Sequence, residues 1–274
     1  MQSSPHSVQE LITKFNITEQ GRGEEILLFA HGFGCDQTTW NKVIPGFKEN
    51  FRVISFDYLG SGNSKLEDYD HKRYETLDAY AEDLAEICTA LKLENIYFIG
   101  HSVSGAIGML ASIAHPKMFK KLITIAPSPH YLNEDDYQGG FDYQDVVELI
   151  KMMQLNYFDW ANYLAPIVIG NEDTPEYSEE LKLSFLRHDP KISTTFAKAT
   201  FFCDLRQELT KVSTEVCILY CIQDIIVPLE VIDYLATHLP NCKTREIEAT
   251  GHYPQITNPC GVISAIKCSI NSST

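Results

Sequence analysis

The sequence has none of the features that direct a chain to a membrane or to the secretory pathway. It contains no apolar run long enough to span a bilayer, and its first twenty residues lack the basic start and apolar core of a secretory signal. Positive charge is scarce, since 22 Lys and Arg face 37 Asp and Glu and leave a formal net charge of -15. A surface of that sign repels phosphate backbones and anionic lipids, which disfavours nucleic acid and membranes as partners. We therefore expect a soluble, cytoplasmic protein.

Closely paired cysteines are also missing. The eight cysteines are scattered along the chain, and no two of them form a CxxC pair. Cys217 and Cys221 enclose three residues of an apolar segment that is typical of a buried strand, which is poor geometry for a zinc site. The pattern favours reduced thiols in the cytoplasm. Neither a metal nor an organic cofactor is predicted.

What the 274 residues do contain is a regular alternation of short apolar runs and helical patterns, with 44% hydrophobic and 22% charged residues. This alternation is typical of an α/β protein, in which helices cover a mostly parallel sheet. The strand candidates are residues 25–32, 51–60, 95–102, 121–128, 215–224 and 243–252. The opening residues 12–20, which turn at Gly21 and Gly23, are predicted to add an antiparallel edge hairpin. Together these predict a single domain with a mostly parallel, eight-stranded sheet.

Helices are predicted between the strands. Apolar residues recur at three- and four-residue spacing over 77–91, and a second helix is expected from Ser102 to a stop at His115-Pro116. Between residues 127 and 202 the strand rhythm disappears, and four aromatic-rich segments have helical patterns instead: 141–153, 158–170, 178–187 and 191–202. A helical insertion between two strands of a parallel sheet is most simply a cap over the strand ends. We predict that residues 127–202 form a lid.

The strongest chemical signal is Gly100-His101-Ser102-Val103-Ser104, which follows a strand and precedes a helix. A serine on a tight strand-to-helix turn exposes its hydroxyl at the edge of the sheet, where a nucleophile is needed. The helix that follows directs its N-terminal dipole and free amides at developing negative charge. The alternative is a serine that only caps the helix. Ser104 stands where such turns usually have glycine, although serine is small enough to fit.

A second loop closes the first long strand with His31-Gly32-Phe33-Gly34. Acyl transfer creates an oxyanion that needs preorganised donors, and the backbone N–H groups of Phe33 and Val103 are the natural pair. On its own, a loop of this composition reads as a tight turn. Its position after a strand, together with the serine turn, predicts an oxyanion hole.

The acid and the base are expected after the last two strands. Asp224 ends the apolar run CILYCIQD, and His252 lies in the turn TGHYPQ after the final strand. A histidine can take the serine proton and return it to the leaving group at neutral pH, while an aspartate fixes its tautomer. Asp224 could instead cap the following helix. The order Ser, Asp, His is the one expected when a serine nucleophile follows a strand of a parallel sheet.

Other candidates are set aside or left open. Asp204 and Asp233 rival Asp224 by charge alone, while Asp57 reads as a loop and capping residue before two glycines. A substrate pocket is predicted from six aromatic residues, which could equally be helix-packing core: Phe33, Tyr131, Phe141, Phe158, Phe196 and Phe201.

With these residues in place, the chain resembles the α/β-hydrolase superfamily over essentially its whole length. More narrowly it resembles the RsbQ group and the plant karrikin and strigolactone receptors. The segments that carry this likeness are HGFGCDQTTW (31–40), FDYLGSGNS (56–64), GHSVSG (100–105), GMLASI (108–113), PSPHYLN (127–133), GGF (139–141) and FFCDLR (201–206). The plant receptors have the same GHSVS turn. The segments HYLNED (130–135) and NYFDWA (156–161) lean toward the bacterial RsbQ side.

The resemblance implies a Ser102, Asp224 and His252 triad, Phe33 as a pocket and oxyanion residue, and a four-helix lid over a small hydrophobic cavity. Two functions then compete. One is a hydrolase that cleaves a small apolar ester or lactone. The other is a receptor or stress-signalling regulator with slow hydrolysis, whose lid binds a protein partner; in the RsbQ group that partner is a signalling phosphatase.

Overall fold

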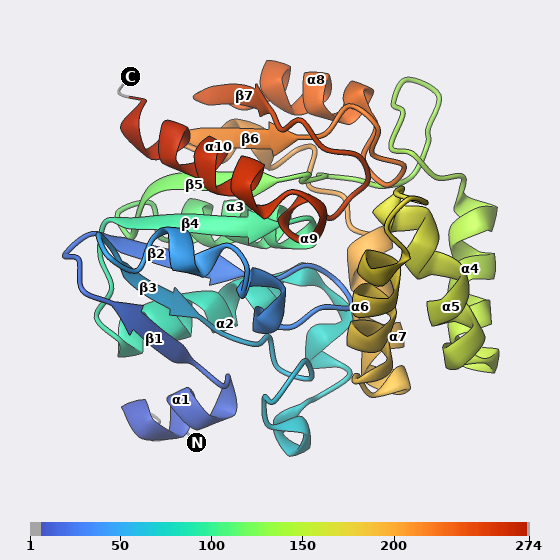
Figure 1. Cartoon of the computed structure of the whole chain (residues 1–274), viewed down its shortest axis with the longest axis horizontal. Coiled ribbons are helices and arrows are strands. Elements are labelled where there is room, and N and C mark those ends of the chain that lie inside the picture. The colour runs from blue at the N-terminus through green and yellow to red at the C-terminus, as the bar shows by residue number, and fades with distance from the viewer. Residues whose placement is uncertain (1–6, 273–274) are drawn as a thin grey trace.

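The computed structural model describes residues 7–272, so the first six residues of the segment inspected for a secretory signal lie outside it. Seven strands form one sheet in the order β1-β3-β2-β4-β5-β6-β7 (Figure 1). Their bounds are β1 Thr18–Gly21, β2 Ile26–Ala30, β3 Arg52–Ser55, β4 Ile96–His101, β5 Phe119–Ile125, β6 Val216–Tyr220 and β7 Cys242–Glu246. β2 to β7 run parallel, and only β1 is antiparallel, paired with β3. The prediction of a mostly parallel sheet is confirmed.

The predicted opening hairpin is wrong, and so is the count of eight strands. Helix α1 (Val8–Lys14) occupies the beginning of that segment, and only β1 remains as an edge strand. This helix begins at a capping box of Ser7 and Glu10, in which each side chain accepts a hydrogen bond from the backbone N–H of the other residue. No hairpin forms because β1 pairs with β3 and not with β2, the next strand along the chain. Asn16 then turns the chain in a left-handed conformation, with φ at 45°. The spacing of Ser7 and Glu10 is a capping signal that could have predicted this helix.

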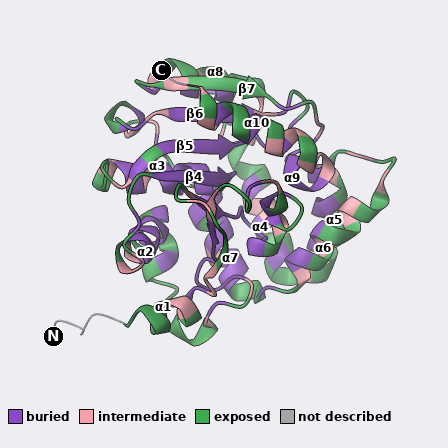
Figure 2. Cartoon of the chain, turned by 60° about the vertical axis from the view of Figure 1, so that its left-hand side comes forward, coloured by how far each residue is buried: buried purple, intermediate pink, exposed green. Residues whose placement is uncertain are grey.

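Two layers of helices cover the sheet, as their buried faces show (Figure 2). The helices outside the β5–β6 connection are α1, α2 (Leu77–Ala90), α3 (Val103–Ala114), α8 (Leu229–His238), α9 (Pro254–Thr257) and α10 (Pro259–Asn271). Alternate residues of the central strands pack against opposite layers. In β2, Leu28 joins the cluster of α2, α3 and α8, whereas Leu27 joins the cluster of α10. No helix among residues 7–272 is both long and apolar enough to cross a bilayer.

The β5–β6 connection holds four helices beyond the carboxyl ends of the strands (Figure 1). These are α4 (Tyr143–Leu155), α5 (Tyr157–Ile169), α6 (Pro175–Leu186) and α7 (Pro190–Phe201), and we call them the helical insertion. The chain enters and leaves it side by side, because His130 bridges Asp204 and the Leu205 N–H donates to the Pro129 carbonyl at 2.8 Å. The four predicted helices of the insertion are confirmed, and they stand over the sheet edge where parallel strands present their loops.

Candidate functional site

Ser102 lies on the turn between β4 and α3, and its backbone is strained. Its φ is 55° and its ψ is -123°, values that an L-residue rarely adopts. The turn is held by the Ser102 N–H, which donates to the Ile125 carbonyl of the neighbouring strand at 2.7 Å. Glycine at position 32 leaves the room that this turn needs, since a Cβ there would lie 2.5 Å from the His101 Nδ1 and 3.3 Å from the Ser102 Cβ. The hydroxyl therefore stands at the carboxyl edge of the sheet.

Three buried side chains form a hydrogen-bonded chain at this edge. The Ser102 Oγ lies 2.8 Å from the His252 Nε2, and the His252 Nδ1 lies 2.8 Å from the Asp224 Oδ2. The exposed fractions are 5% for Ser102, 3% for His252 and 8% for Asp224. In this geometry the serine hydroxyl donates to Nε2, and the Nδ1–H donates to the carboxylate. The structure thus brings together the three residues that the sequence singled out.

Asp224 has a second task, which explains why its sequence context also looked like a cap. Its Oδ1 accepts the backbone N–H groups of Ile226 at 2.8 Å and Val227 at 3.1 Å, so the following loop fixes the carboxylate. Asp224 is at the same time a loop cap and the partner of the imidazole.

The backbone of His252 is clamped from two sides. Its N–H donates to the Val168 carbonyl of α5 at 2.7 Å, and its carbonyl accepts the Nε2–H of His101 at 2.8 Å. Burial lowers the pKa of His101 well below the usual range, which keeps that ring neutral. Gly251, with φ at 78°, allows the close approach to α5, because a Cβ there would lie 2.0 Å from the Ile169 carbonyl oxygen.

The loop from His31 to Gly34 is tied to the serine turn by Ser104. The Ser104 hydroxyl donates to the His31 carbonyl at 2.5 Å, and the Tyr58 hydroxyl lies 2.9 Å from the Ser104 Oγ. A glycine could make neither contact. The serine in the usual glycine position therefore links the two loops, a role that the sequence analysis missed.

The His31 ring braces the same loop. Burial lowers its pKa, so the neutral ring donates from Nδ1 to the Gly32 carbonyl at 2.9 Å and accepts the Tyr58 N–H at Nε2 at 3.1 Å. Among the described residues, the backbone N–H groups of Phe33 and Val103 donate to no hydrogen-bond partner. These two amides are available to an oxyanion.

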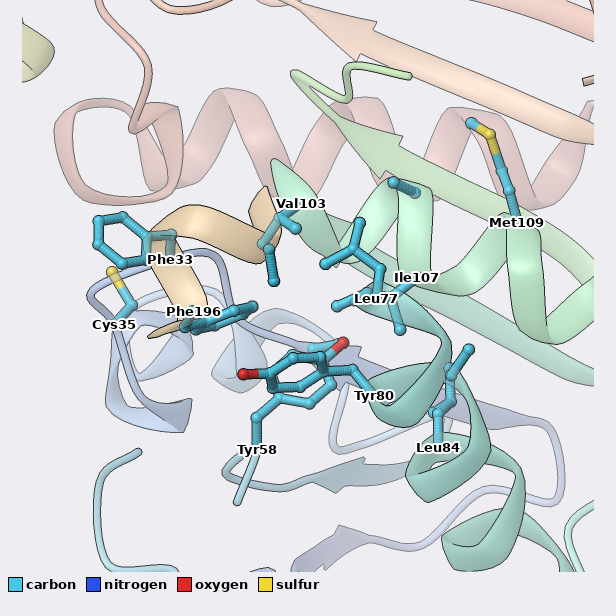
Figure 3. Packing of buried hydrophobic residues seen from close by; sticks show 14 of the residues in the cluster. Phe33, Cys35, Tyr58, Leu77, Tyr80, Leu84, Val103, Ile107, Met109 and Phe196 are labelled. Atoms are coloured by element: carbon cyan, nitrogen blue, oxygen red, sulfur yellow. The ribbon is translucent and has the colours of Figure 1, made fainter. Parts of the chain in front are cut away.

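Phe33 of this loop packs in an aromatic cluster, and Figure 3 shows its ring beside that of Phe196. The Phe33 ring meets Trp160, Phe196 and Phe201 edge to face, at centroid distances of 6.0, 5.8 and 6.1 Å. Phe201 in turn contacts Tyr131 and Phe141. We call these six residues the aromatic roof.

The sequence pattern described as "alpha/beta hydrolase fold" matches residues 25–259. The chain belongs to the α/β-hydrolase fold family. It is 37% identical to a strigolactone esterase of Arabidopsis thaliana over 257 residues. The matched region spans 93% of this chain and 95% of the relative. A "Karrikin insensitive 2" receptor of Petunia hybrida is 36% identical over 92% of this chain and 93% of its own length.

A solved structure gives the same result for the fold. A hydrolase from Oleispira antarctica superposes with a TM-score of 0.95 at 40% identity, over 98% of this chain and 99% of that one. The expected likeness to the strigolactone and karrikin receptors is therefore confirmed, and the leaning toward the RsbQ group stays a prediction.

Some sequence expectations for this α/β-hydrolase need correction. Phe158 does not belong to the aromatic roof, because it is 57% exposed on α5. It follows Tyr157 and precedes Trp160, and the helical period turns those two rings toward each other while Phe158 faces outward. Trp160, which the pocket prediction omitted, takes the inward position and is fully buried.

The other aspartates considered for the site lie elsewhere. Asp57 accepts hydrogen bonds from the backbone N–H groups of Gln37 and Asn63, which agrees with its reading as a loop residue. Asp204 pairs with Arg206, and Asp233 lies on α8. The serine turn by itself suggests no role for His101, and the contact with the His252 carbonyl assigns one.

The clamp on His252 makes position 251 sensitive to any side chain. We expect Gly251→Ala to lower the free energy of unfolding by more than about 2 kcal/mol, because the added Cβ meets backbone and φ is positive. Gly170→Ala is the matched control: its φ is 62° but its nearest contact would be 3.3 Å, so about 1 kcal/mol is expected. Urea unfolding monitored by circular dichroism measures both. Equal losses would contradict the role assigned to the contact with Ile169.

Proposed function

We propose that this protein is a serine hydrolase that cleaves small apolar esters or lactones. The observation that carries the proposal is the hydrogen-bonded chain from Ser102 through His252 to Asp224, with distances of 2.8 Å at both steps. Its membership of the α/β-hydrolase fold family and its likeness to a strigolactone esterase support hydrolysis as the reaction class.

The mechanism follows from the positions of these atoms. The Ser102 Oγ attacks the carbonyl carbon while His252 Nε2 takes its proton, and Asp224 stabilises the imidazolium that forms. The carbonyl oxygen becomes an oxyanion that accepts the Phe33 and Val103 N–H groups. The tetrahedral intermediate collapses, His252 returns the proton to the leaving alkoxide, and an acyl-serine remains. Water, deprotonated by the same imidazole, then releases the acid and regenerates Ser102.

The aromatic roof supports a small apolar substrate. Its six side chains carry no charge, and they come from the loop that holds Phe33 and from the chain segment 131–201. We infer a single domain in which residues 127–202 act as the lid that holds the acyl or lactone portion. The cytoplasm remains our predicted location, on the grounds of cysteine usage and charge.

Removing the nucleophile tests the proposal directly. We expect Ser102→Ala to abolish turnover of p-nitrophenyl acetate, and Asp224→Asn or His252→Gln to lower kcat by roughly 10³- to 10⁴-fold. Asp204→Asn serves as a matched control, since its carboxylate pairs with Arg206 instead, and should change kcat less than about twofold. Intact-mass analysis should show one fluorophosphonate adduct, absent from Ser102→Ala. Undiminished turnover by Ser102→Ala would rule the mechanism out.

The roof also predicts which esters are preferred. p-Nitrophenyl butyrate should have a kcat/KM at least about tenfold higher than a p-nitrophenyl ester whose acyl chain ends in a carboxylate, because burying that charge without a partner is costly. Steady-state kinetics on both esters measures this. Equal values would show that the acyl group is not held among the roof residues.

A second candidate is a receptor or stress-signalling regulator whose hydrolysis is slow. Relatives named as karrikin receptors favour it, and so do exposed apolar side chains at the insertion. Leu155 is 76% exposed, Tyr163 is 56% exposed, and Ile225, next to Asp224, is 58% exposed. A protein partner would cover them, and the resemblance to the RsbQ group implies a signalling phosphatase.

This role predicts partner binding that depends on a ligand. The Ser102→Ala variant, immobilised on a resin and saturated with a small lactone, should retain a specific protein from a host lysate. The same variant with the further substitutions Leu155→Ser and Ile225→Ser should not retain it. The comparison without lactone is the control. Retention of no such protein, together with ester turnover on the order of hundreds per second, would count against the receptor role.

A further inference from the structure

The loop that carries the Phe33 amide has an unusual set of hydrogen bonds. Each of its five successive carbonyl oxygens, from His31 to Cys35, faces a polar side-chain atom at hydrogen-bond distance. The partners, in the order of the carbonyls, are Ser104 Oγ, the His31 ring, Tyr253 Oη, Ser184 Oγ and the His188 ring. These hydrogen bonds fix the backbone of the loop and leave the Phe33 N–H without a partner of its own within the part of the chain that the structure describes.

Two of these partners belong to the helical insertion. The Ser184 hydroxyl of α6 donates to the Gly34 carbonyl at 3.1 Å, and the His188 Nε2, just beyond α6, lies 3.1 Å from the Cys35 carbonyl oxygen. Both side chains are buried. The remaining three partners belong to the core, so only the Gly34 and Cys35 end of the loop depends on the insertion.

Packing and charge hold α6 against the same end of the loop. Gly34 has φ at 71°, and a Cβ there would lie 2.4 Å from the Phe185 ring, which therefore rests directly on the glycine. Arg187 pairs with the buried Asp36 at 2.8 Å. Residues 184–188 thus form a clasp on the loop.

We propose that Ser184 is a positioning residue for the oxyanion loop, so that hydrolysis requires α6 to stay seated on the core. The proposal rests on the proposed hydrolase function, and it names α6 as the element on which that hydrolysis depends. The Phe33 N–H lies in the same peptide as the Gly32 carbonyl, and the Gly34 carbonyl follows two peptides later. Losing the bond from Ser184 frees the torsions of Phe33 and of the left-handed Gly34, through which that peptide is joined to the rest of the loop. Stabilisation of an oxyanion falls steeply when a donor leaves its place.

Ser184 tests this more cleanly than His188. The His188 Nδ1 lies 2.8 Å from the Ser184 carbonyl oxygen, so both ring nitrogens face acceptors, and a neutral ring can donate to only one of them. The Ser184 hydroxyl donates whatever the state of that ring. Ser193 of α7 gives a matched control: it is equally a buried serine of the insertion, and its hydroxyl meets Tyr157 at 2.9 Å.

The experiment compares Ser184→Ala with Ser193→Ala, both in the full chain. For p-nitrophenyl acetate, we expect Ser184→Ala to lower kcat about five- to tenfold, the effect of one lost buried hydrogen bond, with KM within about twofold. Phenylboronic acid, which adds to the serine and places an anionic oxygen in the oxyanion hole, should bind more weakly by the same factor. Ser193→Ala should leave kcat and boronate binding unchanged.

The outcomes separate the positioning role of Ser184 from the proposed function. An unchanged kcat in Ser184→Ala, or an equal fall in both variants, overturns the positioning role, whereas a wild-type chain without Ser102-dependent turnover overturns the proposed function itself. If Ser184→Ala fails to fold, Arg187→Met removes the ion pair to Asp36 from a half-exposed side chain. It should then reproduce the parallel fall in kcat and boronate affinity, about two- to threefold, and the absence of that fall overturns the inference.

Discussion

The left-handed backbone at Ser102 is the constraint on which the rest of the site depends. A conformation of this kind costs on the order of 1–3 kcal/mol, and it persists only where the surroundings allow no other. Here β4 feeds directly into α3, the Ser102 N–H binds β5, and Gly32 leaves space beside the serine. The sharpness of this turn lifts the hydroxyl out of the sheet edge, where His252 can reach it. A relaxed serine would lie along the helix.

The other two residues of the candidate triad, His252 and Asp224, are held in place by contacts with the backbone. The His252 main chain is bound by α5 on one side and by the neutral His101 ring on the other. One carboxylate oxygen of Asp224 accepts hydrogen bonds from the backbone of its own loop, and the other accepts one from the imidazole. The imidazole therefore has its orientation set before any substrate arrives, which is the condition for electrostatic preorganisation.

The helical insertion takes part in the site at two separate places. α5 contacts the His252 loop, and the end of α6 contacts the loop of Phe33. Its inner face supplies Trp160, Phe196 and Phe201 to the roof, whereas Phe158 and Leu155 stay exposed on its outer face. One element thus shapes the apolar environment, supports the polar groups and presents a surface to solvent, so a movement of the insertion would reach all three.

Local patterns determined most of the fold and all three members of the candidate triad. Strands, loops and the serine turn leave periodic or positional signals, and parallel topology alone places the loops after β4, β6 and β7 at one edge. Contacts between distant segments leave no such signal. The hydrogen bond from Ser104 to His31, the clamp of His101 on His252, and the seat of α6 on Gly34 join residues far apart in the chain. The orientation of α5 about its own axis decides that Trp160 is buried and Phe158 is exposed. These were decided by tertiary structure, because a hydrogen bond or a packed ring depends on where two segments meet in space, which neither segment encodes by itself.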